Sequence, residues 1–413
     1  MQKSDEYRKF EKNIDLHIKS YLNRHYLLYG LSIIFSRGLE LAVMFFAAKF
    51  LIKSVYGELE YYKKVLELGG VFLSFGFPTL ILTYTRSKAS KIYLLLFATI
   101  FVVVLSLLIW PILWYLHWSD LWASFLFYAL FFTGGIYPVY VLVRKGSDAA
   151  SFYKIGLALL FYSGVVFYIL YSSAPSFSFV YTSRLLMLPA AVLLISEWIR
   201  NPIVWRFFRK YTRLFIRLLS GSLAVFLSNF TNMMFLYTDI FIIKWLSSHP
   251  GLEIADYGFS LNVANILMLI PFTLVQADIE IIKTDRTYFK ILHKKILLLV
   301  LFLSFFLIPA YFLLISHYYV RFKATFWLFL IILLAKIFQS QGVLYGAGLL
   351  ILRKYGINLR INLFMIITNI VLTYLFYKSW GLYGVAFASA LSLLIRYFLL
   401  EKNYQKMESN KKL

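Results

Sequence analysis

Long apolar runs recur along the whole chain, and they restrict its fold more than any other feature. Of the 413 residues, 61% are hydrophobic and 15% are charged, and the mean hydropathy is +0.74. Soluble domains are about 45–50% apolar, and a helix needs about 20 consecutive apolar residues to cross a bilayer. The sequence therefore predicts an all-α polytopic membrane protein in place of soluble domains.

Twelve runs are long enough to span a bilayer, and short loops connect them. The predicted spans are residues 26–51, 67–84, 92–116, 121–143, 153–172, 177–199, 214–245, 256–281, 291–316, 324–345, 361–378 and 381–400. The longest basic connection follows the sixth span, so the chain divides into two halves of six. Transporters commonly place their pathway between two such halves. We therefore expect twelve transmembrane helices in two six-helix lobes around a central lumen.

The predicted organisation has five segments. Residues 1–25 form an amphipathic cytoplasmic segment, 26–199 the N-lobe, 200–213 a basic cytoplasmic linker, 214–400 the C-lobe and 401–413 a cytoplasmic tail. In the first segment, apolar residues recur on one helical face from Tyr7 to Tyr21, as in a helix that lies on a membrane surface.

The net charge of +23 follows the predicted topology. With the N-terminus inside, 31 of the 42 Lys and Arg residues fall on the inner side. The seven on the outer side are Lys53, Lys63, Lys64, Lys244, Arg321, Lys323 and Lys378. This asymmetry is the positive-inside rule and places both termini in the cytoplasm. The basicity thus indicates orientation, and no nucleic-acid partner is expected. The chain has no cysteine and its six histidines are scattered, so neither a metal site nor a cofactor is expected.

Three basic residues fall inside the predicted spans at depths where a charge is costly. Arg37 lies near the middle of the first span with Glu40 at i+3, Lys336 lies at mid-depth in the tenth beside Gln339, and Arg184 lies in the outer third of the sixth. Intramembrane ionisable residues usually face a bundle interior or a water-filled cavity. We therefore predict that Arg37, Lys336 and Arg184 line the lumen. The alternative is that Arg37 and Glu40 only join their helix to a neighbour.

Polar residues also form stripes along several spans. Arg217, Ser228, Asn232 and Asp239 share a narrow arc of the seventh span at about 100° per residue. The full set of polar residues predicted to face the lumen is Glu40, Ser228, Asn232, Asn265, Gln276, Gln339, Asn362 and Asn369. A single intramembrane Asn more often joins two helices, but stripes on several spans favour a hydrated lumen. Its deep cations suit an anionic substrate, above all a phosphate.

Asp239 has the opposite sign to these deep cations, so direct binding of phosphate is not its expected role. Two roles remain open from the sequence. The carboxylate either pairs with a basic residue such as Arg184 or Lys49 and latches the outer gate, or takes up a coupling proton or Na⁺. The latch is the preferred interpretation.

Three stretches resemble a known family. They are "VYGELEYYKKVLELGGVFLSFGFPTLILTYTRSK" (residues 55–88), "LLSGSLAVFLSNFTNMMFLYTDIFIIKWL" followed by "ADYGFSLNVANIL", and "WGLYGVAFASALSLLIRYFLL" near the end. The first contains a Tyr-Gly pair and then Gly76 and Pro78, and the second contains the aspartate. In these features the chain resembles polysaccharide repeat-unit (O-antigen) flippases of the multidrug/oligosaccharidyl-lipid/polysaccharide exporter superfamily.

The resemblance implies that the chain moves an undecaprenyl-pyrophosphate-linked oligosaccharide across a bacterial inner membrane by alternating access. The implied partners are this lipid-linked substrate, membrane lipids and other polysaccharide-assembly membrane proteins, and a proton or Na⁺ gradient is the implied driving force. The lumens of this family are generally rich in cations, whereas this sequence has few.

Two other functions compete with this interpretation. A drug/cation antiporter of the same superfamily would carry more deep carboxylates in an aromatic pocket. A polysaccharide polymerase or ligase would need a large external loop with catalytic Arg or His, and every predicted external connection is short. No catalytic or nucleotide-binding motif is present. The sequence therefore predicts a transporter and not an enzyme.

Overall fold

The part of the chain that the structure describes is built from helices. A computed structural model describes residues 24–83, 88–201, 207–277, 282, 286–352 and 354–409. The first half contains α2 (Arg24–Phe50), α3 (Lys53–Ser74), α4 (Phe77–Thr83), α5 (Lys88–Tyr115), α6 (Trp122–Leu130), α7 (Ile136–Lys145), α8 (Ser147–Tyr171) and α9 (Ser178–Arg200). The second contains α10 (Phe208–Leu246), α11 (Pro250–Ala264), α12 (Leu269–Ala277), α14 (Arg286–Leu313), α15 (Phe326–Ile351) and α16 (Tyr355–Ser409). The predicted amphipathic segment, residues 1–25, lies almost wholly outside the described residues.

These helices account for the twelve predicted spans. Among the described residues, nine helices are long and apolar enough to cross a membrane. The second span is the pair α3 and α4, joined at Gly76, where φ is +74°, and the fourth is the pair α6 and α7. The eleventh and twelfth run on as α16, which bends at Gly381 with φ of +57°. Positive φ is easily adopted only by glycine. The prediction of an all-helical, twelve-span fold is confirmed.

The predicted start of the second span is wrong. Helix α3 begins at Lys53, whereas the hydropathy pattern places this start at residue 67. Lys63 and Lys64, expected in an external loop, lie in the helix with exposed fractions of 3% and 6%. Acidic and basic residues alternate along this stretch at spacings of three and four, so their side chains can pair along the helix. Hydropathy counts each charge separately and therefore misses the helix.

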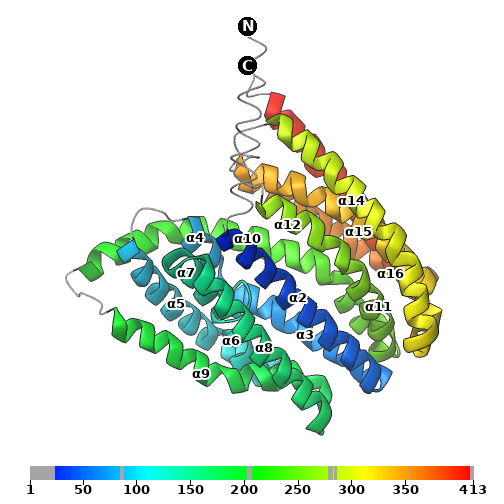
Figure 1. The fold of residues 1–413 in the computed structure, drawn as a ribbon, viewed down its shortest axis with the longest axis horizontal. Helices are drawn as coiled ribbons and strands as arrows, with labels where there is room; N and C mark the ends of the chain where they lie inside the picture. The colour runs from blue at the N-terminus through cyan, green and yellow to red at the C-terminus, as the bar shows by residue number, and fades with distance from the viewer. Residues whose placement is uncertain are drawn as a thin grey trace.

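The helices form two lobes (Figure 1). In the N-lobe, α2 packs against α8, and α3 packs against α6. In the C-lobe, α15 packs against both α14 and α16. Helix α10 packs along α16, and its beginning also contacts α4 and α5 of the N-lobe. We count α10 with the C-lobe. It follows the first half in sequence and is one of the helices that join the two halves in space.

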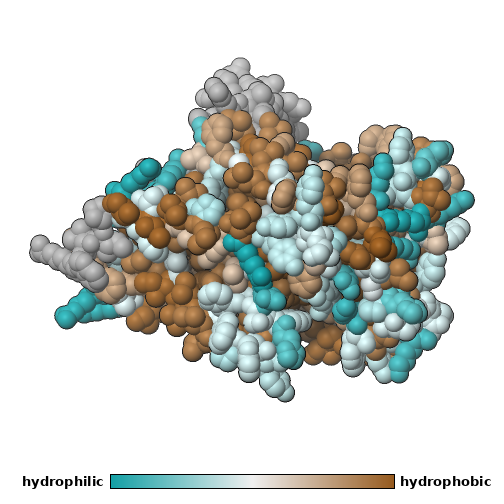
Figure 2. Space-filling model, turned by 90° about the horizontal axis from the view of Figure 1, so that it is seen from below, coloured by the Kyte–Doolittle hydropathy of each residue, from teal (hydrophilic) through white to brown (hydrophobic). Residues whose placement is uncertain are grey.

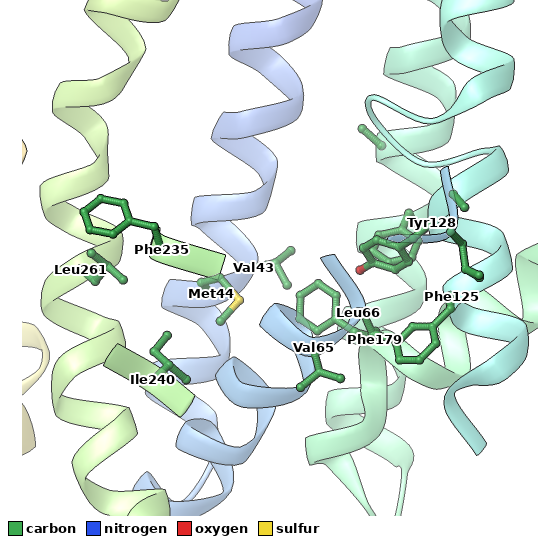
Figure 3. Close-up of a cluster of buried hydrophobic side chains, with 14 of the residues drawn as sticks. Val43, Met44, Val65, Leu66, Phe125, Tyr128, Phe179, Phe235, Ile240 and Leu261 are labelled. Atoms are coloured by element: carbon green, nitrogen blue, oxygen red, sulfur yellow. The ribbon is translucent and has the colours of Figure 1, made fainter. Parts of the chain in front are cut away.

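Apolar side chains fill the lobes and also cover their surfaces. In the close-up of Figure 3, Val65 and Leu66 of α3 face Phe125 of α6 and Phe179 of α9 inside the N-lobe. Large apolar residues such as Leu108 and Leu188 are exposed on the surface. Figure 2 shows hydrophobic side chains spread over much of one face of the molecule. A surface of this kind matches the hydrocarbon core of a bilayer.

The lobes touch where α3 and α11 begin, and we call this place the outer contact. A Cβ added at Gly57 would lie 1.8 Å from the carbonyl oxygen of Gly251, so the two backbones meet with no side chain between them. The Lys53 ammonium lies 2.6 Å from Oδ1 of Asp256, and Arg321 donates to the carbonyl oxygen of Leu51. The positive-inside rule predicts that this end faces the outside. The molecule is therefore closed there.

Candidate functional site

A polar cavity of about 370 Å³ lies between the lobes. Its lining comes from α2, α3, α6, α8 and the break before α7 in the N-lobe, and from α10, α11, α12 and α15 in the C-lobe. The polar lining residues include Ser36, Arg37, Glu40, Lys64, Glu67, Ser74, Tyr128, Tyr162, Tyr237, Asn262, Asn265, Lys336 and Gln339. On α3 the lining begins at Lys64, about two turns beyond the outer contact. The cavity therefore lies beyond that contact, away from the start of α3.

One charged group in the cavity is built around Glu40 of α2. Its Oε2 lies 2.7 Å from Nη1 of Arg37, and its Oε1 lies 2.6 Å from Nζ of Lys63. Glu40 thus bridges two cations from two helices. The Arg37 side chain lines the cavity and remains 54% exposed. A guanidinium has five N–H donors, and a fork of two matches a phosphate edge.

A second charged group connects the lobes. The Lys64 ammonium lies 3.3 Å from Oε2 of Glu67 within α3, and the hydroxyl of Tyr237 on α10 donates to the same carboxylate oxygen. The Lys64 ammonium also lies 4.7 Å from the centre of the Tyr237 ring, a favourable cation–π distance. This contact holds α3 and α10 together at the cavity wall.

The C-lobe adds a single cation to the described lining, Lys336 of α15. Its ammonium donates to Oε1 of Gln339 at 2.7 Å, and no carboxylate lies within 4 Å of it among the described residues. Three cations and two carboxylates thus line the cavity. Both carboxylates are occupied by partners of their own. The charged residues of the described lining therefore carry a net formal charge of +1, and Lys336 is the cation among them that no carboxylate pairs with.

The sequence predicted part of this site. The structure places Arg37, Glu40, Asn265, Lys336 and Gln339 in the lining of one cavity. Gln276 lies near the end of α12, and its side chain is outside the described part of the structure. The residues that the sequence missed are Lys63, Lys64, Glu67 and Tyr237. The acidic and basic residues in "EYYKKVLE" occur at helical spacing, and this spacing was the available signal.

Four of the predicted polar lumen residues lie elsewhere, and three of them, Ser228, Asn232 and Asn362, lie between α10 and α16. Asn358 donates to the Ser228 hydroxyl at 3.0 Å, while Arg396 donates to Oδ1 of Asn232 at 2.7 Å and to Oδ1 of Asn362 at 3.2 Å. These contacts join α10 to α16 inside the C-lobe. The prediction that Ser228, Asn232 and Asn362 line the lumen is wrong, because the striped face of α10 packs on α16. Arg396 on α16 is the common donor to Asn232 and Asn362.

Asp239 is buried in the same lobe, with an exposed fraction of 4%. The hydroxyls of Tyr257 and Ser389 donate to its carboxylate, and Asn369 Nδ2 donates at 3.2 Å. Asn369 therefore lies beside Asp239 and not in the lumen. A hollow of about 20 Å³ adjoins this group, and Lys336 also lines it, which is room for one water-sized particle.

Arg184 is separate from both cavities. Its guanidinium lies 3.1 Å from Oδ1 of Asp120 and also donates to the backbone oxygen of that residue. The prediction that Arg184 lines the lumen is therefore wrong. Among the described residues, Asp239 forms no pair with Arg184 or Lys49, so a latch with either of them is not formed. The cation that lines the hollow beside Asp239 is Lys336.

The fold resembles several solved transporters. An inward-facing multidrug resistance MATE family transporter of the MOP superfamily aligns with a TM-score of 0.61 at 12% identity, covering 91% of this chain and 94% of the other. Lipid II flippase MurJ in an inward closed conformation aligns at 0.56 with 15% identity, covering 92% and 87%. This chain therefore has the fold of these transporters. An outward-facing MATE transporter aligns at 0.57 with 13% identity, covering 94% and 96%. These neighbours are transporters and a flippase, not enzymes. No protein-family model matches the chain, and no curated protein matches it.

Proposed function

We propose that the protein is a flippase that moves an undecaprenyl-pyrophosphate-linked oligosaccharide, an O-antigen or capsule repeat unit, across a bacterial inner membrane. The observation that carries this proposal is the set of cations in the central cavity. Arg37 and Lys64 come from the N-lobe and Lys336 from the C-lobe. The MOP-superfamily fold supports transport, and one structural neighbour is named as a flippase for lipid II.

The chemistry of the lining suits a phosphate group attached to sugars. Arg37 presents a planar guanidinium that can hold a phosphate through two parallel bonds, while Lys64 and Lys336 supply point charges. Asn262, Asn265 and Gln339 offer amides for sugar hydroxyls. A volume of about 370 Å³ lies within the usual range for small-molecule sites. The polar head would occupy the cavity while the hydrocarbon tail remains in the bilayer.

Alternating access would follow from the two lobes. In this conformation the outer contact is closed and the cavity lies on its inner side, so the substrate enters from the cytoplasm. Opening the contact between Gly57 and Gly251 while the inner ends approach would expose the same cavity to the outside. A phosphate held by cations of both lobes would stabilise the intermediate in which the lobes are closest.

We further propose that Asp239 takes up a coupling proton or Na⁺. Its carboxylate is buried, its partners are neutral donors, and a hollow that fits one small particle adjoins it. Intramembrane carboxylates with such surroundings commonly serve as ion sites in transporters. Because Arg184 and Lys49 are not near it, the ion role now replaces the latch as the better-supported hypothesis.

The test is translocation of a labelled undecaprenyl-pyrophosphate oligosaccharide in proteoliposomes. Arg37→Ala and Lys336→Ala should each abolish translocation, whereas Arg184→Ala should retain it because Arg184 lies away from the cavity. In cells, the first two variants should lose surface polysaccharide while protein remains in the membrane. Wild-type translocation by both would refute pyrophosphate binding in the cavity.

A drug/cation antiporter is the second candidate. Glu40 and Glu67 face the same cavity as Tyr128, Tyr162 and Tyr237, and this combination of carboxylates and aromatic rings suits an organic cation. Several structural neighbours are MATE transporters. Competition in a binding assay separates the candidates. Binding of an undecaprenyl-pyrophosphate sugar that survives excess tetraphenylphosphonium and is lost in Lys336→Ala supports the flippase. Binding of tetraphenylphosphonium that is lost in the double variant Glu40→Gln and Glu67→Gln supports the antiporter.

A further inference from the structure

A second cavity of about 290 Å³ lies on the other side of the wall that bounds the central site. Helices α3, α5 and α6 of the N-lobe and α10 of the C-lobe line it. The lining residues on α3 and α10 are Val65, Leu68, Gly69, Phe72, Leu73, Phe230, Met234 and Phe241. The remaining ones include Ile109, Leu113, Leu116, Trp118, Trp122 and Phe125. Almost every one of these side chains is apolar.

The same stretches of α3 and α10 face both cavities with alternating residues. On α3, Glu67 faces the polar cavity while Leu68 faces the apolar one. On α10, Tyr237 faces the polar cavity and Met234 faces the apolar one. The two helices therefore form a wall that is polar on one side and apolar on the other. Ring contacts close this wall, since Phe72 lies 5.4 Å from the ring centre of Phe230.

The polar groups of Ser106 and Trp122, which line the apolar cavity, are already hydrogen-bonded within the protein. The Ser106 hydroxyl donates to the carbonyl oxygen of Val103 at 2.7 Å, and the indole of Trp122 donates to the Ser106 carbonyl at 3.1 Å. A buried water needs two to four polar partners, and these groups already have theirs. An empty space would leave the lining side chains without contacts on one side. Hydrocarbon is the filling that suits such a lining.

We propose that this cavity binds one acyl chain of a membrane glycerophospholipid. Ser106, Ile109 and Leu113 lie in the membrane span Ser90–Tyr115, so the cavity is at the depth of the lipid tails. Leu116, which also lines the cavity, is 49% exposed, so the lining reaches the molecular surface there. The space is many times larger than the hollow beside Asp239, which fits one water-sized particle, so it has room for a run of methylenes.

The occupant is a separate lipid and not the tail of a transported molecule. A molecule whose head lies in the central cavity would have to pass its tail through the wall of α3 and α10, where Phe72 contacts both Phe226 and Phe230. Because α10 belongs to the C-lobe and the other lining helices to the N-lobe, the bound chain contacts both lobes. It therefore favours the arrangement in which the outer contact is closed.

The first experiment identifies the occupant by photo-crosslinking. The variant Phe230→p-benzoylphenylalanine places a photoreactive group in the cavity, and Phe302→p-benzoylphenylalanine places it on an outer face of α14, where Phe302 is 65% exposed. Both proteins are purified from membranes, washed in lipid-free detergent, illuminated and analysed by mass spectrometry. A phospholipid adduct at 230 that is absent at 302 is expected. No phospholipid at 230, or an isoprenoid adduct there, would overturn the proposal.

The second experiment fills the cavity. Ser106→Leu adds bulk inside the lining, and Ser106→Ala removes the same hydroxyl while leaving the space open. In the photoreactive background, Ser106→Leu should lose the phospholipid adduct and Ser106→Ala should keep it. Added phospholipid should raise the melting temperature of Ser106→Ala but not that of Ser106→Leu. Equal adduct yields or equal melting shifts in the two variants would place the lipid elsewhere and contradict the proposal.

Discussion

Replacing Gly57 by alanine should open the outer side of the molecule. The added Cβ would lie 1.8 Å from the Gly251 oxygen and 2.9 Å from the amide nitrogen of Ala255. A carbon and a carbonyl oxygen normally stay about 3.3 Å apart or more, so α3 and α11 must separate by about 1.5 Å. Overpacking of this kind costs about 1–3 kcal/mol. Because the cost falls only on the closed contact, it would change the ratio of open to closed molecules by about 5- to 150-fold.

Labelling of a single cysteine measures this shift. The chain contains no cysteine, so Asn265→Cys in the cavity lining would be the only thiol. A membrane-impermeant maleimide is applied to vesicles of each orientation. In Gly57→Ala, labelling from the outer side should rise and labelling from the inner side should fall, relative to the Gly57 parent.

The matched control is Gly156→Ala on α8, where an added Cβ meets nothing within 4 Å. It should label like the parent from both sides. Size-exclusion chromatography shows whether each variant remains folded. If folded Gly57→Ala labels like Gly156→Ala from both sides, the α3–α11 contact does not control access, and the reasoning fails.

Three further substitutions test other parts of the structure. Asp239→Asn keeps the shape of the buried group but removes its charge, so transport in proteoliposomes should no longer respond to an imposed proton or Na⁺ gradient; a preserved response would rule out ion uptake at this residue. Arg396→Leu leaves the side-chain oxygens of Asn232 and Asn362 without their donor, so the free energy of unfolding should fall by about 1–3 kcal/mol, and the melting temperature with it. Arg360→Leu, at an exposed position, should leave the melting temperature unchanged. Gly69→Val would press its Cβ to within 2.3 Å of the Phe125 ring, so the melting temperature should fall well below that of Gly156→Val; equal values would show that α3 and α6 are not tightly packed there.

Most of the fold follows from the sequence, because the cost of placing polar groups in hydrocarbon is visible residue by residue. A run of apolar residues must lie in the bilayer wherever its neighbours lie. The exception is the start of α3, where Glu60, Lys63 and Lys64 are buried in a helix and Glu67 is partly buried. Hydropathy assigns each of them the cost of an isolated charge. In the structure, Glu40 from α2 and Tyr237 from α10 supply partners, and these partners are remote in sequence.

The candidate site was predictable only in part for a related reason. A charged side chain deep in the membrane, such as Arg37 or Lys336, is costly to place in hydrocarbon and must face polar surroundings. Its presence in a span therefore indicates a polar cavity. An amide such as Asn232 or Asn362 can be satisfied equally well by one neighbouring side chain. Helical periodicity shows that such residues share a face of their helix. It does not show whether that face meets a cavity or, as here, Arg396 on α16.

Because of the position of Lys336, an ion bound at Asp239 should have opposite effects on the binding of the two candidate substrates. Lys336 lines both the central cavity and the small hollow beside Asp239. A proton or Na⁺ that neutralises Asp239 leaves the Lys336 ammonium with less negative charge nearby, so an anion in the cavity should bind more tightly and an organic cation less tightly. Couplings of this kind are about 1–3 kcal/mol, or 5- to 150-fold in affinity, and are reciprocal. Titration of a lipid pyrophosphate and of tetraphenylphosphonium with and without the ion measures both signs. Tighter pyrophosphate binding with the ion, lost in Asp239→Asn, is expected of the flippase. If the ion instead weakens binding of tetraphenylphosphonium, and Asp239→Asn removes this weakening, the protein is an antiporter. If the ion changes neither affinity, Asp239 is not coupled to the cavity.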